Sequence, residues 1–571
     1  MSADLTAGSP PIPAPPLKEA KRSRLRFSAL DLIALLLSLT LAIPIVSVCL
    51  SLLSGESTVF VHLAQTVLPE YAGNTLMLTA LVVLGVLVVG VPAAWLTACC
   101  EFRGRRVLEA VLILPLAAPA YVLAYAYAGF LSAYGPVQEA LRSITGWETG
   151  DYWFPDVRSL PGAALMLTLT LYPYVYLLAR AQFLNESAAA LESARLLGRG
   201  PIASFFAVSL PLARPALVAG ATLAAMNAFA DYGTVSYFGV PVFTTGIYSA
   251  WFSFSDQTAA REMAAVLIGF VALALLAERY LRGRALFHET GRRDRRPPRA
   301  ALSGVKSTGA ILACVVPPFL GFVIPALVLG ELLIESGGPT RDFSRHLFDT
   351  LTLAAAAGAI VTLGALILAF ARKERPQRLA GRAASFASLG YAVPGSVIAV
   401  GVLAPFAAFD NAFASFAQTM FGVSPGLVLT GGIAALLFAY TALYLAVALQ
   451  SVGAGLERIT PSVGGAARLL ARGPWDALRR VHLPLIAPSV LTAALLVFVD
   501  VMKELPATLM LRPFNFDTLA IAANNYASDE RLSWAAAPSL AIVAAGIIPC
   551  ILLIRGIAAS THGRNERPPL P

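Results

Sequence analysis

The chain contains long stretches without a single Asp, Glu, Lys or Arg. A helix needs about 20 mainly apolar residues to cross the hydrocarbon core of a bilayer. Uncharged stretches of that length lie at 32–55, 71–100, 110–138, 159–179, 307–330, 350–371, 383–409 and 532–554. The stretch 411–456 can hold a loop and a further span, and shorter stretches lie at 215–230, 263–277 and 481–499. We therefore predict an all-α membrane protein with about twelve transmembrane helices.

Composition and cysteine positions restrict the chemistry. Of the 571 residues, 57% are hydrophobic and 13% charged, which is too little charge for the surface of a soluble domain. All five cysteines lie in apolar stretches, so neither a disulfide framework nor a CxxC metal site is indicated. The chain has no GxxxxGK[ST] phosphate-binding loop. If ATP drives this protein, another subunit must hydrolyse it, and we expect no cofactor and no bound metal in this chain.

Arginine and lysine mark the loops that remain in the cytoplasm. They cluster before the first predicted helix and after helices 2, 4, 6, 8 and 10, whereas the alternate loops are poorer in them. Both termini are therefore predicted to be cytoplasmic. The same bias accounts for the net charge of +9, so we expect no binding of nucleic acid.

One short segment occurs twice. LLGRGPIASFFAVSLPLARP at 196–215 has a counterpart, LLARGPWDALRRVHLPLIAP, at 469–488. At a constant offset of 273, residues 194–217 and 467–490 are identical at twelve of twenty-four positions. Six predicted helices separate equivalent positions, so both copies face the same way across the membrane. The pattern indicates a tandem duplication whose two six-helix halves form a parallel repeat.

Each copy has the features of a short helix, a break and a second short segment that leads into the next span. Ser187 and Thr460 are suitable N-caps, and Gly-Pro pairs at Gly200 and Gly473 end the first helix. A simpler interpretation is a pair of ordinary capped loops between membrane helices. Two matching copies at the same topological place argue against it, because unconstrained loops have no reason to keep a common shape.

These segments resemble the cytoplasmic EAA loop of binding-protein-dependent ABC importer permeases, whose pattern is E-A-A, three residues, G, nine residues and I-x-L-P. The first copy fits with Glu192-Ser193-Ala194, Gly198 and Val208-Ser209-Leu210-Pro211. The second copy departs from the pattern, since Gly465 stands at the Glu position and Ala471 at the Gly position. It retains Ala466, Ala467, Val481, Leu483 and Pro484.

The resemblance implies a permease subunit rather than an enzyme. In that family the loop forms a coupling helix that docks on an ATPase. We therefore expect two copies of an ATPase subunit that bind Mg-ATP, a periplasmic binding protein that delivers the substrate, and alternating access in a bacterial inner membrane. The expected coupling residues are Glu192, Ser193, Ala194, Gly198, Gly200, Leu210 and Pro211 in the first half and Gly465, Ala466, Ala467, Ala471, Gly473, Leu483 and Pro484 in the second.

The fusion of two halves in one chain suggests the iron(III) or the thiamine branch of these permeases. The segments 231–252 and 503–520 resemble the iron(III) branch, and thiamine or another small cation is the alternative. The expected organisation is a cytoplasmic tail at 1–27, a first half at 28–283 with its coupling loop near 187–211, a basic cytoplasmic linker at 284–306, a second half at 307–557 with its coupling loop near 460–484, and a tail at 558–571.

Two acidic residues at equivalent positions are candidates for the substrate pathway. Asp231 and Glu504 each lie about 20 residues beyond their Leu-Pro pair, which is ~30 Å along a helix from the cytoplasmic end. As symmetry equivalents they can face each other and offer a passing cation two hard carboxylate ligands. The alternative is a pair of solvated charges at helix ends, and Lys503 beside Glu504 weakens the cation hypothesis.

Helices 3 and 4 are rich in tyrosine, for which pore lining and ordinary helix packing are both open interpretations. The residues are Tyr121, Tyr125, Tyr172, Tyr174 and Tyr176.

Two other classes compete with the importer. A twelve-helix secondary carrier usually keeps ionisable residues in mid-membrane, and most spans here have none. A membrane enzyme would need a cluster of His, Asp or Glu near one interface, and no such cluster stands out in the sequence.

Overall fold

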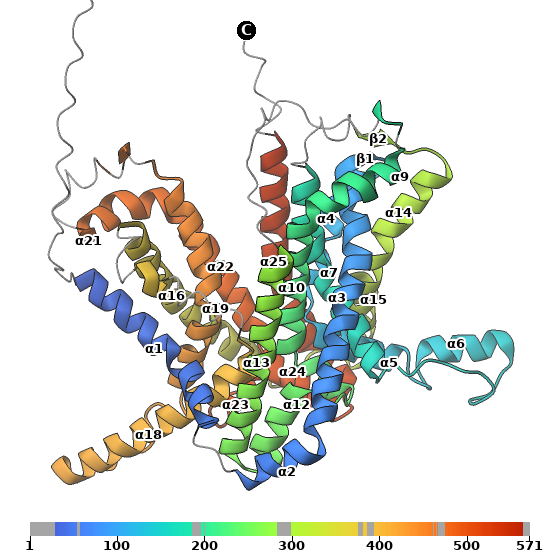
Figure 1. Ribbon diagram of the computed structural model, residues 1–571. Coiled ribbons are helices and arrows are strands. Elements are labelled where there is room, and N and C mark those ends of the chain that lie inside the picture. Colours follow the sequence, from blue (N-terminus) through green and yellow to red (C-terminus); the bar gives the residue numbers. More distant parts are fainter. Residues whose placement is uncertain are drawn as a thin grey trace, which may run out of the picture.

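The computed structural model describes residues 29–53, 57–184, 196–198, 200–282, 299–374, 381–384, 393–460, 462–463, 465 and 474–562. In these ranges the chain is almost entirely helical (Figure 1). Eleven of the described helices are long and apolar enough to cross a membrane. Arg105–Ala117 and Ala120–Phe130, bent by 90° at Pro119, make a twelfth if they count as one span. The prediction of an all-α membrane protein with about twelve spans is confirmed.

The helices of the first half follow in the order of the predicted spans. Their bounds are α1 Ala29–Ser51, α2 Thr58–Thr66, α3 Leu68–Cys99, α4 Arg105–Val111, the 3₁₀ turn η1 Leu114–Ala117, α5 Ala120–Phe130, α6 Pro136–Thr145, α7 Leu160–Leu184, α9 Pro201–Ser204, the π turn η2 Phe205–Ser209, α10 Leu210–Ala230, α11 Gly233–Tyr237, α12 Phe243–Tyr248, the π turn η3 Ser249–Ser253 and α13 Gln257–Arg282.

The second half repeats much of this order. Its bounds are α14 Val305–Pro318, the π turn η4 Phe319–Val323, α15 Ile324–Glu335, α16 Phe343–Glu374, α18 Gly395–Phe421, α19 Ile433–Glu457, α21 Pro474–Ala477, the π turn η6 Leu478–His482, α22 Leu483–Met502, α23 Pro506–Leu511, α24 Leu519–Ser528 and α25 Leu532–His562.

The first span of each half packs on the opposite half. Helix α1 lies against α16, α18 and α19 of the second half and also against α13. In return, α14 lies beside α3 and α4, α15 lies beside α5, and the η4 turn between them contacts α7 of the first half (Figure 1). The two halves are therefore interlocked by exchanged helices. The hydrophobic pattern of the sequence does not predict such an exchange, because an apolar span has the same pattern whichever half it packs against.

The two copies of the repeated segment fold alike. Helix α9, η2 and α10 begin 273 residues before α21, η6 and α22. The π turns have a common cause in Pro211 and Pro484, because proline lacks an N–H and its ring clashes with the carbonyl four residues earlier. Accordingly Leu210 N–H bonds to the Phe205 carbonyl five residues back, and Leu483 N–H bonds to that of Leu478.

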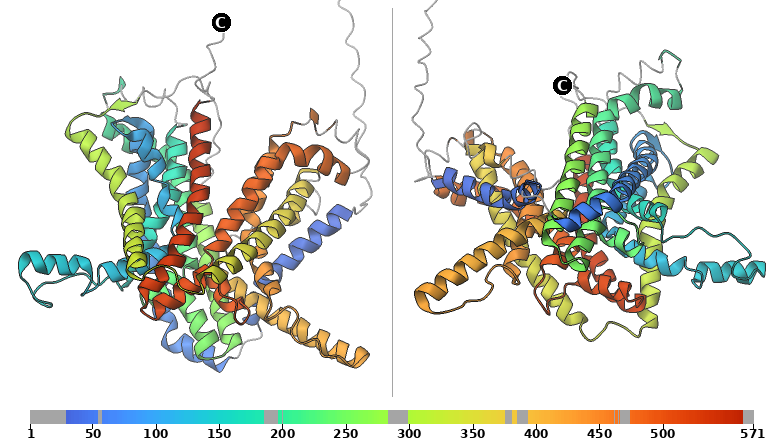
Figure 2. Two further views of the ribbon diagram at one scale, coloured as in Figure 1. Left: turned by 180° about the vertical axis from the view of Figure 1, so that it is seen from behind. Right: turned by 60° about the horizontal axis from the view of Figure 1, so that its bottom comes forward.

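Two features lie outside the simple pattern of spans. Helix α6 and the end of α18 project sideways from the bundle in different directions (Figures 1 and 2). The strands β1 Cys100–Glu101 and β2 Ala300–Ala301 pair in parallel and join the loop after α3 to the segment before α14. Arg299 supports this junction through the Ala98 carbonyl and the Glu101 carboxylate, at 3.4 and 3.3 Å.

Candidate functional site

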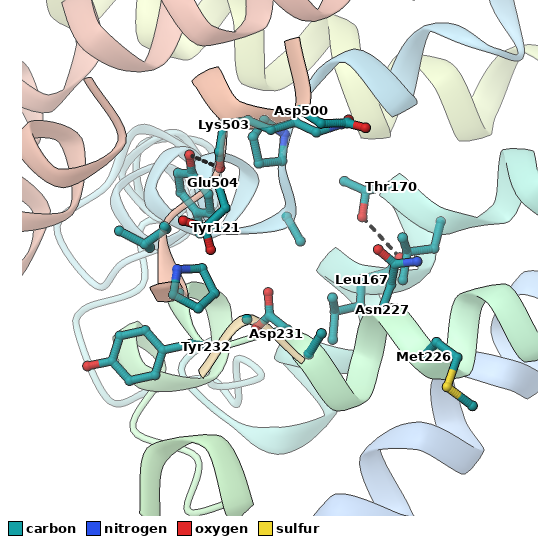
Figure 3. A pocket seen from close by; sticks show the side chains of 18 of the residues that line it. Tyr121, Leu167, Thr170, Met226, Asn227, Asp231, Tyr232, Asp500, Lys503 and Glu504 are labelled. Carbon is teal, nitrogen blue, oxygen red and sulfur yellow. Dashed lines mark hydrogen bonds and ion pairs between the residues drawn. The ribbon is translucent and has the colours of Figure 1, made fainter. Parts of the chain in front are cut away.

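A cavity of about 260 Å³ lies where the two halves meet (Figure 3). It is formed at the breaks in the helices rather than along any single span. Its walls come from the η1–α5 bend, from α7, from the end of α10, from the start of α18, from α19 and from the end of α22. The polar residues among its lining are Tyr121, Thr170, Tyr174, Asn227, Asp231, Tyr232, Tyr444, Asp500, Lys503 and Glu504.

The two acidic residues singled out in the sequence both line this cavity. Each accepts hydrogen bonds from the first turn of a short helix that follows its span, α11 for Asp231 and α23 for Glu504. Asp231 accepts hydrogen bonds from Thr234 N–H and Val235 N–H, at 3.1 and 3.2 Å. Glu504 accepts them from Ala507 N–H and Thr508 N–H, at 2.7 and 2.9 Å. The carboxylates thus satisfy backbone donors that a helix start leaves unpaired.

Burial distinguishes these carboxylates from solvated helix-end charges. Glu504 is 7% exposed, and Asp231 points into the same open space as Tyr121 and Glu504 (Figure 3). Both lie in the breaks that follow the spans. Burial raises the pKa of both carboxyl groups, that of Asp231 to about 6, against the lowering effect of their hydrogen bonds.

A third carboxylate, that of Asp500, also lines the cavity, although the sequence alone did not point to it. Asp500 occupies the position equivalent to Asn227 at the offset of 273, and both line the cavity. Lys503 forms an ion pair with Asp500 at 2.9 Å. Three acidic side chains therefore face one basic side chain in this space. The sequence held one indication of Asp500: the second repeat has an aspartate where the first repeat has Asn227.

The tyrosines of α5 and α7 serve two purposes. Tyr121 lines the cavity and donates to the Lys503 carbonyl at 3.1 Å, across the junction of the halves. Tyr125 donates to Asn524 Oδ1 at 3.2 Å. Tyr172 and Tyr176 instead donate to the carbonyls of Leu112 and Glu109, at 2.9 and 3.2 Å. Tyr174 lines the cavity.

The coupling candidates are only partly within the described residues. Glu192, Ser193, Ala194, Ala466, Ala467, Ala471 and Gly473 lie outside them. Gly198 has a φ of +76°, a left-handed conformation that favours glycine. A Cβ added at Gly200 or Gly465 would meet no atom within 4 Å, so neither glycine is needed for close packing inside this chain. Leu210-Pro211 and Leu483-Pro484 open α10 and α22.

The described part of the chain contains no group of three His, Cys, Asp or Glu side chains placed to hold a metal ion. The three cavity carboxylates are accordingly not assembled into a coordination site.

An ion pair joins the halves at the end of the bundle where α7 and α25 begin. Arg158 binds Glu530 through two hydrogen bonds, of 2.8 and 3.0 Å, and lies over the Tyr237 ring at 5.1 Å. The hydrogen bond from Arg158 lowers the pKa of Glu530. Because the folded-state pKa is lowered, the contact stabilises the folded chain at pH values above the ordinary carboxyl pKa. This stabilisation is lost as the pH falls through the lowered pKa.

Charge reversal of Arg158 to Glu should loosen this contact between the halves. Since exposed ion pairs contribute ~0.2–1 kcal/mol, the ATPase activity of the assembled transporter without substrate should rise by a factor of about 1.4 to 5. The double variant Arg158→Glu, Glu530→Arg should return it to the wild-type level. Equal activity in the single and the double variant would contradict the role of the pair.

The interlocked helical halves, with a polar cavity at their broken helices, define an integral membrane permease. The chain belongs to the family of binding-protein-dependent transport system inner membrane components, whose family model matches residues 87–281. It is 29% identical to an Fe(3+)-transport system permease protein, FbpB 2, of Haemophilus influenzae, over 92% of this chain and 97% of that protein. It is 31% identical to the molybdenum transport system permease protein ModB of Azotobacter vinelandii, over 29% of this chain and 70% of that protein. For ModB of Escherichia coli K12 the identity is 29%, over 36% of this chain and 89% of that protein.

Family membership settles the class of the protein. The chain is the membrane subunit of an ABC importer, located in the inner membrane, and it works with an ATPase and a substrate-binding protein. It is not itself an enzyme and carries no cofactor. The secondary carrier and the membrane enzyme are thereby excluded as alternatives.

Proposed function

We propose that this permease imports iron(III) delivered by a periplasmic binding protein. The similarity to the Haemophilus Fe(3+) permease supports this substrate because it extends over both halves, 92% of the chain, whereas the molybdenum permeases match about a third of it. The observation that carries the proposal is the cavity charge. Three carboxylates against one ammonium group attract a cation and repel an anionic substrate such as an oxyanion.

In this proposal Asp231 and Glu504 guide the cation across the junction of the halves. Carboxylate oxygens suit a hard ion such as iron(III). Their bonds to short helices keep them at the helix breaks, so a movement of α11 or α23 carries its carboxylate with it. Thiamine or another small cation is the alternative substrate of the same cavity.

In this proposal each half of the chain docks one ATPase copy. The segments 187–211 and 460–484 are the two docking points, one for each of two ATPase copies, and they contain all the coupling candidates. Helix α1 begins and α25 ends at the same end of the bundle as α9 and α21 (Figure 1). If that end is cytoplasmic, as the arginine-rich loops indicate, both termini are cytoplasmic too.

Uptake measurements test the substrate directly. Cells with and without this chain should be compared for uptake of radiolabelled ferric iron, thiamine and molybdate. We expect loss of the chain to abolish iron uptake and to leave the other two unchanged. Loss of thiamine or molybdate uptake alone would retain the importer but overturn the iron proposal.

Glu192→Lys should weaken docking of the ATPase. A reversed charge at the first position of the coupling loop should lower the ATPase that co-purifies with the chain by about tenfold, equivalent to ~1.4 kcal/mol of binding free energy. Arg458→Glu, which reverses a charge just before the second loop, is the comparison variant. It should not reproduce the loss of ATPase seen in Glu192→Lys. Wild-type co-purification and wild-type ATPase stimulation in Glu192→Lys would reject the coupling role.

A further inference from the structure

We propose that a groove between α1, α13 and α18 binds one phospholipid molecule. The groove has a volume of about 540 Å³ and is separate from the cavity between the halves, since the two share no lining residue. Its lining is mainly aliphatic, and it contains one charged side chain, Arg261. The full lining is Leu39, Ala42, Ile43, Val46, Ser47, Leu50, Ser51, Arg261, Ala404 and Pro405.

One face of α1 forms the long wall of this groove. The lining positions from Leu39 to Ser51 are spaced three and four residues apart, as one stripe of a helix requires. At 1.5 Å per residue the stripe is ~18 Å long. The hydrocarbon core of one leaflet is about 15 Å thick, half of the ~30 Å core of the bilayer. The groove therefore has the length of an acyl chain region in one leaflet.

The opposite wall is α18, which crosses α1 in close contact. A Cβ placed on Gly401 would lie 2.4 Å from the Pro44 carbonyl oxygen, so the two backbones nearly touch there. Ala404 and Pro405, one turn further along α18, line the groove. Small side chains at these positions leave the space open, while Leu39, Val46 and Leu50 remain at least half exposed along its edge.

The charged end of the groove lies at one membrane boundary. The Ser57 hydroxyl, at the start of α2 and six residues beyond α1, donates to Asp256, just before α13, at 2.7 Å. This bond places the start of α13 at the end of the bundle where the chain passes from α1 to α2. Arg261, one turn into α13, is therefore near the end of the groove marked by Ser51 rather than in mid-membrane.

Arg261 can take a phosphate at that boundary. Its Nε and Nη2 contact the Gln257 carbonyl and the Thr258 hydroxyl, each at 3.3 Å. Within the described residues its Nη1 donates no hydrogen bond. The nearby Asp256 carboxylate accepts from Ser57 and from the N–H groups of Thr258 and Ala259. A guanidinium with donor capacity above an apolar groove matches the phosphate and acyl chain of a phospholipid.

An acyl chain can enter the groove from the lipid, because α1 is exposed along the groove's edge. The occupant that fits both the length of the apolar stripe and the charge at its end is a phospholipid.

Native mass spectrometry tests this site on the whole transporter, purified with its ATPase from vesicles of phosphatidylethanolamine and phosphatidylglycerol. We expect one phospholipid to remain bound to the wild type in mild detergent. Arg261→Gln should reduce the retained fraction about tenfold, while Arg261→Lys should keep most of it. Arg531→Gln, which changes an exposed arginine on the loop before α25, is the matched control and should retain the lipid.

A second variant blocks the groove without removing the charge. Ala404→Trp fills the space beside α1 and should also release the lipid, and a wild-type elution profile will show that the transporter remains folded. Equal phospholipid retention by the wild type, Arg261→Gln and Ala404→Trp would overturn the proposal. Loss in Arg531→Gln as large as in Arg261→Gln would do so as well, because it would indicate a general effect of charge.

Discussion

Neutralising both Asp231 and Glu504 should reduce iron uptake about 10- to 100-fold. The double variant Asp231→Asn, Glu504→Gln preserves the size of each side chain and keeps one acceptor oxygen at each position. The asparagine oxygen can still accept from Thr234 N–H and Val235 N–H in the first turn of α11, and the glutamine oxygen from Ala507 N–H in α23. The change therefore removes charge from the cavity while each short helix keeps a bond to the side chain before it.

The expected size follows from electrostatics. Two unit charges 4 Å apart interact by ~4 kcal/mol at an effective dielectric constant of 20. Water in the cavity reduces this, and a residual ~1.4–2.8 kcal/mol corresponds to the 10- to 100-fold range. Because the lengths of α10 and α22, ~30 Å each, separate Leu210 and Leu483 from the changed residues, ATPase stimulated by the docked binding protein should remain at the wild-type level.

The control for this variant is Asp529→Asn. Asp529 lies at the end of α24, is exposed and does not line the cavity. Its neutralisation should leave uptake unchanged. Wild-type uptake in the double variant would remove Asp231 and Glu504 from the pathway, and an equal loss in Asp529→Asn would point to overall charge instead.

Gly546→Val should destabilise the whole transporter more than any other change considered. A Cβ at Gly546 in α25 would lie 2.1 Å from the Ala117 carbonyl oxygen in η1. Backbone atoms cannot move aside as a side chain does, so α25 and η1 must separate. Overpacking costs ~1–3 kcal/mol in ordinary cores, and we expect the melting temperature in detergent to fall by roughly 5 °C or more.

Gly269→Val provides the matched comparison within a long membrane helix. Gly269 lies in α13, and a Cβ there meets nothing within 4 Å. The same substitution should change the melting temperature little. If Gly546→Val and Gly269→Val unfold at the same temperature, the close approach of α25 to η1 does not contribute to stability.

The sequence predicted those features that the bilayer or the repeat imposes. The spans were predictable because a helix in lipid must be long and apolar. The offset of 273 paired Asp231 with Glu504, and both indeed line one cavity. That each carboxylate caps a short helix was less visible, although the helix-starting segments Gly233-Thr234 and Pro506 directly follow them.

Features that depend on contacts between distant helices could not be predicted. The exchange of α1 with α14 and α15 leaves no periodic signal. The predicted stretch 383–409 and the helix α18, Gly395–Phe421, also differ, because Pro394 starts the helix and Gly422 ends it in a left-handed conformation. The 90° bend at Pro119 had a local signal, the residue pair Ala118-Pro119, since proline disfavours a helical conformation in the residue before it.

The exchanged helices impose an order on biosynthesis. Helix α1 ends at Ser51, but its partner α16 begins at Phe343, 292 residues later. At 5–20 residues per second, the ribosome takes roughly 15–60 s to deliver that partner. During this interval α13 can already pack on α1, but the face of α1 that contacts α16, α18 and α19 stays uncovered in the bilayer. Its Ser38 hydroxyl bonds to the Ala34 carbonyl within the same helix at 2.8 Å, so this polar group tolerates lipid until the second half arrives.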